Sequence, residues 1–154
     1  MQEMNPVKWA IRPLGRYADF KGRSPRAEYW WFTLITCSFS IPLDLFDRAT
    51  GMGDAIGTIV NLALFLPSLA VTVRRLHDTN RSGRWLSGLL AGVFIVAAVS
   101  AVIPGSATLI IAGLLCVAAG ATLFCFLVLP GSQGPNDYGA DPYGTDEQLE
   151  EVFA

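Results

Sequence analysis

Apolar residues are gathered into four long runs, and short polar segments between them carry most of the charge. The runs predict helices at about 25–46, 55–75, 85–103 and 107–129. A helix of about 20 residues spans about 30 Å, which is the thickness of the hydrocarbon core of a bilayer. The last two runs have no charge on any face, whereas the helices of a soluble bundle have a charged outer face. The pattern therefore predicts an all-α membrane protein with four transmembrane helices.

Composition supports a membrane protein over a soluble domain. Apolar residues make up 52% of the chain and charged residues 16%, where a soluble domain has about 25% charged residues. The net charge of −2 is small, and the basic residues adjoin apolar runs instead of forming one broad basic surface. We therefore expect no nucleic-acid partner.

Basic residues predict the orientation, because loops rich in Lys and Arg stay in the cytoplasm. Six of the eleven basic residues precede Tyr29, four lie between Arg74 and Arg84, and none lies in the last seventy residues. The segment between the first two runs has only Arg48, and the turn at Pro104 has no basic residue. This alternation places both termini in the cytoplasm.

The chain divides into a basic N-terminal segment (1–24), a four-helix transmembrane domain (25–130) and a Gly/Pro-rich acidic cytoplasmic tail (131–154). Asn5-Pro6 is typical of a helix start. The residues that follow alternate between apolar and basic at helical spacing, which predicts an amphipathic helix attracted to anionic lipid. These residues are Val7, Lys8, Ile11, Arg12, Leu14 and Arg16.

Small residues in the third and fourth runs predict close helix packing. Gly88 and Gly92 form a GxxxG pair, with packing inside the four-helix bundle and a homo-oligomer interface as the two interpretations. The three cysteines have no metal-binding spacing, and we expect no metal and no cofactor.

Three polar motifs stand out, and the predicted topology places all of them on the cytoplasmic side. They are GRSPRAEYWWF (22–32), RRLHDTNRSGRW (74–85) and LPGSQGPNDYGADP (129–142). In order and position they resemble the bacterial DUF805 family of small membrane proteins over nearly the whole chain. Small departures are Pro25, Arg84 and Ala140. The resemblance implies a multi-pass protein of the bacterial inner (plasma) membrane, and it implies no catalysed reaction.

The arginines of the first two motifs are candidates for binding an anion or an anionic lipid, because guanidinium groups bind phosphate and carboxylate bidentately. The alternative is that they only fix the topology and extend to the interface. The candidates are Arg23, Arg26, Arg74, Arg75, Arg81 and Arg84.

A second candidate cluster is polar, with His77 and Asp78 as a pair for proton transfer or as structural residues. The GPNDYGADP tail is expected to fold back, either as a plug in which Asp137 and Asp141 meet the arginines or as a lid over a ligand. The members of this cluster are Glu28, His77, Asp78, Asn136, Tyr138 and Asp141.

Three functions follow from these patterns, in decreasing order of support. The first is a non-catalytic module that binds membrane lipid, in particular anionic phospholipid, or a partner protein at its cytoplasmic face. The second is a small oligomeric transporter or channel. The third is a membrane enzyme acting on lipid head groups, with His77 as general base and Asp78 as its orienter. The sequence has no recognisable catalytic motif that supports this third function, and we expect no enzyme.

Overall fold

The computed structural model describes residues 5–50, 55–103 and 105–143, and within them it is all-helical. The helices are α1 (Pro6–Gly15), α2 (Arg26–Thr50), α3 (Ala55–Asp78), α4 (Arg84–Val102) and α5 (Ser106–Val128). The described residues contain no strand, only an isolated bridge between Asn136 and Gly139. The predicted all-α class is confirmed.

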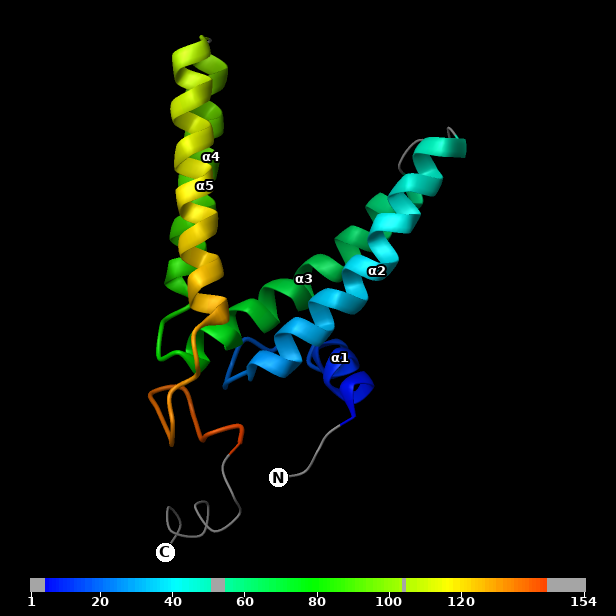
Figure 1. Cartoon of the computed structure of the whole chain (residues 1–154), viewed down its shortest axis with the longest axis vertical. Coiled ribbons are helices and arrows are strands. Elements are labelled where there is room, and N and C mark those ends of the chain that lie inside the picture. The colour runs from blue at the N-terminus through cyan, green and yellow to red at the C-terminus, as the bar shows by residue number, and fades with distance from the viewer. Residues whose placement is uncertain (1–4, 51–54, 104, 144–154) are drawn as a thin grey trace, which may run out of the picture.

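The long helices form two antiparallel pairs that diverge from a common vertex, which is the region where α3 ends at Asp78 and α4 begins at Arg84 (Figure 1). The first arm is α2 with α3, and the second arm is α4 with α5. The short helix α1 lies across the base of the first arm, and the described tail also lies at the vertex. The described helices therefore do not pack as one four-helix bundle. Neither α4 nor α5 has a polar stripe, and lipid solvates their apolar surfaces as well as a helix would.

Three of the described helices are long and apolar enough to cross a membrane, not the four predicted. They are Ile56–Asp78, Arg84–Val102 and Ser106–Val128. The α2 helix has 25 residues, about 38 Å at 1.5 Å per residue, so length does not exclude it. Its hydropathy is lowered by several hydroxyl side chains, by Pro42 and by Asp44. The correction concerns the apolarity of α2 and leaves its helical structure as predicted.

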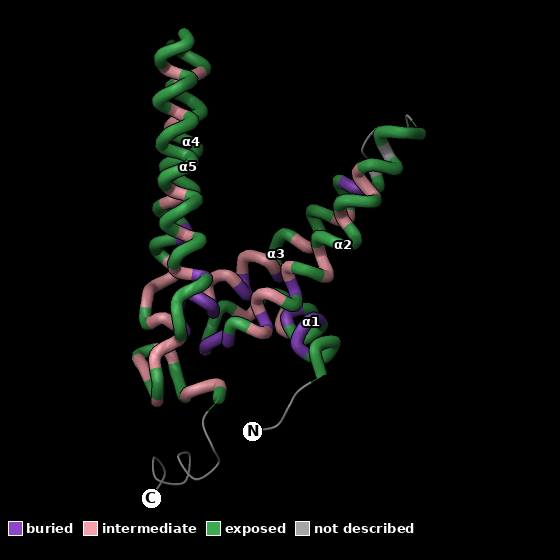
Figure 2. The backbone as a smooth tube through the Cα atoms, in the orientation of Figure 1, coloured by how far each residue is buried: buried purple, intermediate pink, exposed green. Residues whose placement is uncertain are grey.

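Burial is inverted relative to a soluble protein (Figure 2). The charged side chains of Glu28, Arg74 and Arg75 are fully buried at the vertex, while nearly all of the apolar surface of α4 and α5 is exposed. Charged residues are almost never fully buried unless they are paired, and a large continuous apolar surface marks contact with a non-aqueous environment. The α4–α5 arm is therefore a surface for lipid, and the vertex is the polar core.

The glycines of the GxxxG pair, Gly88 and Gly92, line a cavity of about 230 Å³ between α4 and α5. A Cβ atom built at Gly88 or Gly92 would meet no atom within 4 Å outside the helix's own backbone and chain neighbours. The expected close packing of these glycines inside the molecule is therefore absent.

The α1 helix is capped at its start and has a buried face and an exposed apolar edge. Asn5 caps its first turn by accepting a 3.0 Å hydrogen bond from the backbone N–H of Val7. Trp9, Ala10 and Pro13 are buried against the first arm. An apolar edge of exposed residues remains, formed by Val7, Ile11 and Leu14.

Candidate functional site

The second motif (74–85) begins at the end of α3, and its backbone carbonyls accept hydrogen bonds from the first motif (22–32) and the third motif (129–142). The N–H of Ser24, just before α2, donates to the carbonyl of Arg74 at 3.0 Å, and the N–H of Ser132 in the tail donates to that of Asp78 at 2.8 Å. The predicted loop at 74–85 is thus partly helical, because α3 continues to Asp78. Three segments far apart in the sequence meet at the vertex, and the helical register of α3 fixes where they meet.

Asp78 is the centre of a buried ion cluster with Arg23 and Arg75. Its Oδ1 accepts from Arg23 Nε at 3.0 Å, and its Oδ2 accepts from Arg75 Nη1. All three side chains are at most 5% exposed. A buried carboxylate is tolerated when it is both paired and hydrogen-bonded, and two guanidinium groups meet that requirement here.

The same arginines hold the tail by its backbone carbonyls. Arg23 donates from Nη1 to the carbonyl of Gly134 at 2.6 Å and from Nη2 to that of Ser132 at 2.5 Å. Arg75 donates to the carbonyls of Leu127, at 3.1 Å, and Leu129. The last carbonyls of a helix have no partner within it, so Arg75 caps the end of α5. Lysine lacks the planar fork of donors needed to contact a carboxylate and carbonyls together.

A second buried pair joins α2 to α3. Glu28 Oε1 accepts from Arg74 Nη2 at 3.2 Å, and Glu28 Oε2 lies 3.4 Å from Arg12 Nη1. Arg74 also donates from Nη1 to the carbonyl of Asp19 at 2.5 Å. Arg74 and Glu28 therefore fix α1 and the segment after it to the base of the first arm.

His77 is held by ring stacking and backbone contacts, not by its neighbouring carboxylate. Its ring stacks on Tyr138 with centroids 4.0 Å apart and planes 6° apart, and Nδ1 lies 3.1 Å from the carbonyl of Gly22. Asn136 donates to the His77 carbonyl at 2.9 Å. Because Asp78 is engaged by arginines, the His77–Asp78 pair has no base-and-orienter geometry. The structural interpretation fits these contacts, and the third function loses the pair on which it depended.

The tail folds back on the vertex through turns. Asn136 Oδ1 accepts from the N–H of Tyr138 at 2.9 Å, and Asn136 and Gly139 exchange backbone hydrogen bonds across the turn. Gly139 has φ +137°, which an L side chain rarely adopts. Asp141 accepts from the N–H of Gly134 and from that of Tyr143, both at 2.9 Å. The expected ion pairs between the tail carboxylates and the arginines do not form among the described residues, because the arginines bind tail carbonyls instead.

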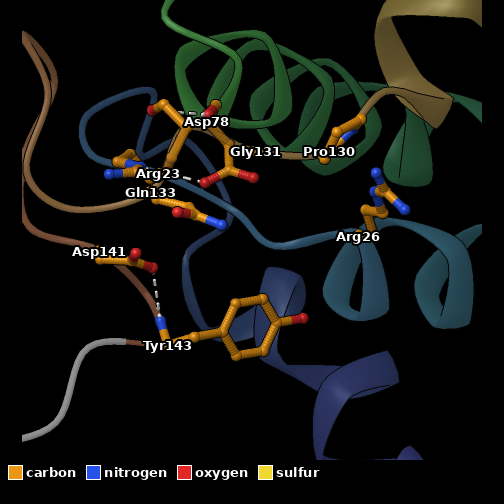
Figure 3. A pocket seen from close by; sticks show the side chains of 9 residues that line it. Arg23, Arg26, Asp78, Pro130, Gly131, Gln133, Asp141 and Tyr143 are labelled. Atoms are coloured by element: carbon orange, nitrogen blue, oxygen red, sulfur yellow. Dashed lines mark hydrogen bonds and ion pairs between the residues drawn. The ribbon is translucent and has the colours of Figure 1, made fainter.

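A cavity of about 410 Å³ lies between the tail and the start of α2 (Figure 3). Arg26 projects into it from α2 and donates from Nε to the Leu129 carbonyl at 3.1 Å. A Cβ atom at Gly131 would lie 2.2 Å from Asp78 Oδ2, so only glycine allows the tail this close to the ion cluster. The cavity is lined by Arg23, Arg26, Asp78, Pro130, Gly131, Ser132, Gln133, Asp141 and Tyr143.

Two candidate arginines have other surroundings. The guanidinium of Arg81 lies 3.8 Å over the ring of Phe126, a cation–π contact, and Arg84 is exposed at the start of α4.

Sequence reasoning missed Gly131 and Tyr143 as residues of the cavity wall, and it missed the contact of Arg12 with Glu28. The glycine-rich composition of the tail was the only signal for Gly131, since its meaning depends on which side chain it approaches.

Two titrating groups outside the long helices have shifted pKa values. The hydrogen bond from Arg16 lowers the pKa of Asp19, and burial raises the pKa of Tyr143. The lowered Asp19 pKa means that its pairing with Arg16 stabilises the fold at pH values above the unfolded-state pKa, and this stabilisation is lost as the pH falls through the folded-state pKa.

The described residues contain no group of three His, Cys, Asp or Glu side chains that could hold a metal ion.

The chain matches the family model described as "Protein of unknown function (DUF805)" over residues 17–140. It is 32% identical over 137 residues to inner membrane protein YhaI of Escherichia coli K12, covering 88% of this chain and 96% of the relative. It is 42% identical over 84 residues to inner membrane protein YhaH of the same organism, covering 51% of this chain and 69% of the relative. No solved structure matches the chain. The matches and the apolar helices together identify a multi-pass inner-membrane protein.

Proposed function

The chain belongs to the DUF805 family, and we propose that it is a non-catalytic inner-membrane module that binds anionic phospholipid at its cytoplasmic face. In this proposal α2 crosses the membrane beside α3, so that four helices span it and both termini are cytoplasmic. The vertex then lies at the cytoplasmic head-group level.

The α1 helix is the observation that carries the proposal. Its apolar edge (Val7, Ile11 and Leu14) is exposed, and Lys8 is exposed on the same helix. Such a surface is unfavourable in water and suits the boundary between head groups and acyl chains, where anionic lipid attracts the lysine.

Internal pairing decides which cations are available to a lipid. The guanidinium groups of Arg23, Arg74 and Arg75 are occupied by carboxylates and carbonyls at the vertex. Lys8, Arg26 and Arg84 are exposed and form no ion pair with any described residue. Of the six candidate arginines, Arg23, Arg74 and Arg75 form a structural core, and Arg81 contacts the ring of Phe126. The remaining two, Arg26 and Arg84, are exposed, and together with Lys8 they are proposed to contact phosphate.

The orientation is supported by where the charges lie. The basic segments gather at the vertex, while α2 ends and α3 begins at the far tip of the first arm (Figure 1). Because α2 has 25 residues and α3 has 24, the paired helices extend over similar lengths. A membrane that accommodates α3 therefore also surrounds α2, whose polar Asp44 lies 3.5 Å from Asn61 of α3.

The test is native mass spectrometry of the gently extracted protein, with phosphatidylglycerol and phosphatidylcholine offered in equal amounts. The wild type is expected to retain phosphatidylglycerol several-fold more often. The triple variant Lys8→Gln, Arg26→Gln, Arg84→Gln is expected to lose that preference. Arg48→Gln is the matched control, since Arg48 is an exposed arginine near the far end of α2. Equal retention of both lipids by the wild type would reject the proposal.

A further inference from the structure

Two apolar grooves open side by side where α1 meets the first arm. The larger, of about 560 Å³, lies between α1, α2 and α3, with walls that include Ile11, Phe39 and Leu64. The smaller, of about 250 Å³, lies between α1 and α2, with walls that include Val7, Trp31 and Leu34. Both grooves are lined by Ala10 and Ile35, so these residues form the ridge between them.

The larger groove runs along the arm away from the vertex. Its α2 wall extends from Phe32 to Leu43, a rise of about 16 Å at 1.5 Å per residue. The groove therefore begins at the level of α1 and continues beside the candidate span of α3.

Neither groove presents free polar groups for a polar ligand. The Thr36 hydroxyl in the larger groove contacts the carbonyls of Phe32 and Thr33, both at 3.0 Å. The Ser38 hydroxyl in the smaller groove donates to the carbonyl of Leu34 at 2.8 Å. With their hydroxyls bonded within α2, the walls offer an occupant apolar contact alone, which suits a hydrocarbon chain.

We infer that the paired grooves bind one two-chain phospholipid, with one acyl chain on each side of the Ala10–Ile35 ridge and the phosphate beside Lys8. Lys8 supplies the charge complementarity, since it follows Val7 of the smaller groove and lies about one turn before Ile11 of the larger one. The inference rests on the proposed function for the placement of α1 at head-group level. It adds a defined chain-binding site to that function.

The experiment counts phospholipids retained after detergent washing, by native mass spectrometry of the full chain. Ala63→Leu fills the larger groove and Ser38→Leu fills the smaller one. Ala91→Leu is the control, because Ala91 is an exposed alanine on α4. Each groove variant is expected to reduce the most tightly retained phospholipid at least five-fold, while Ala91→Leu retains it as the wild type does.

Retention of that lipid by both groove variants would overturn the inference. Helical circular dichroism and a single elution peak are required of each variant, and Leu43→Phe in the larger groove replaces Ala63→Leu if that variant does not fold. Loss of the lipid in the groove variants without any head-group preference in the wild type supports the chain site and rejects the anionic preference. A head-group preference that persists with both grooves filled supports the anionic preference and rejects the chain site.

Discussion

At the scale of single residues, Asp78 organises the vertex. One carboxylate receives hydrogen bonds from Arg23 and Arg75, and the same two arginines extend to the carbonyls of the tail and of the end of α5. The arginines are thereby oriented as well as neutralised. The tail is further held by hydrogen bonds from Ser132 and Asn136 to carbonyls at the end of α3, by its own turns, and by the stacking of Tyr138 on His77.

Asp78→Asn is expected to destabilise the protein by about 3–5 kcal/mol, because two buried guanidinium groups lose their counter-charge. The measurement is thermal unfolding of the protein in detergent, together with limited proteolysis of the tail, which should become more rapid. Asp137→Asn is the matched control, since Asp137 is exposed and makes no ion pair with a described residue. An unchanged melting temperature and tail cleavage rate in Asp78→Asn would show that the cluster does not hold the tail.

At the scale of elements, α2 differs from the other long helices. Its polar side chains lower its hydropathy, yet many of them bond within the helix or to its neighbours. The hydroxyls of Thr33, Ser38 and Thr50 contact carbonyls one turn earlier in α2, and Glu28 at its start pairs with Arg74. A helix that satisfies its polar groups in this way is compatible with a bilayer.

Cysteine labelling tests whether α2 crosses. In a variant whose three native cysteines are replaced by alanine, Ala49→Cys is expected to react with a membrane-impermeant maleimide in intact spheroplasts. Asn80→Cys is expected to react only after permeabilisation, because it follows the basic end of α3 at the vertex. If neither position reacts before permeabilisation, α2 does not cross the membrane.

At the scale of the whole molecule, the two arms meet at a polar vertex and diverge from it (Figure 1). The vertex contains the directional contacts, namely buried ion pairs and hydrogen bonds to carbonyls. The α4–α5 arm is apolar on all faces, and at most 6% of the most apolar stretch of either helix is buried. Directional contacts thus hold the two arms together at one end.

Cross-linking in native membrane vesicles tests the divergence. A short bis-maleimide is expected to leave the pair Arg48→Cys and Val102→Cys unlinked, since these positions lie near the tips of different arms. The pair Val102→Cys and Ser106→Cys, at the tip of the second arm, is expected to cross-link and serves as the positive control. Efficient linkage of the first pair within one chain would show that the arms close into a bundle.

The sequence by itself determined the helices and where polar chemistry gathers. Helical length, uniform apolarity and the positions of charge are local properties, and they are enough to predict α3, α4, α5 and the three motifs at their ends. The resemblance to DUF805 depended on the same motifs, and the family match confirmed it.

Tertiary structure alone decided the partners within those motifs and the arrangement of the arms. Arg23 lies 55 residues from Asp78 and 111 from Gly134 in the sequence, so no local pattern indicates that it contacts both. The same six arginines fit a ligand site and a structural core equally well until their hydrogen-bond partners are known. Divergence of the arms was equally hidden, because an apolar helix surface packs as well against lipid as against another helix.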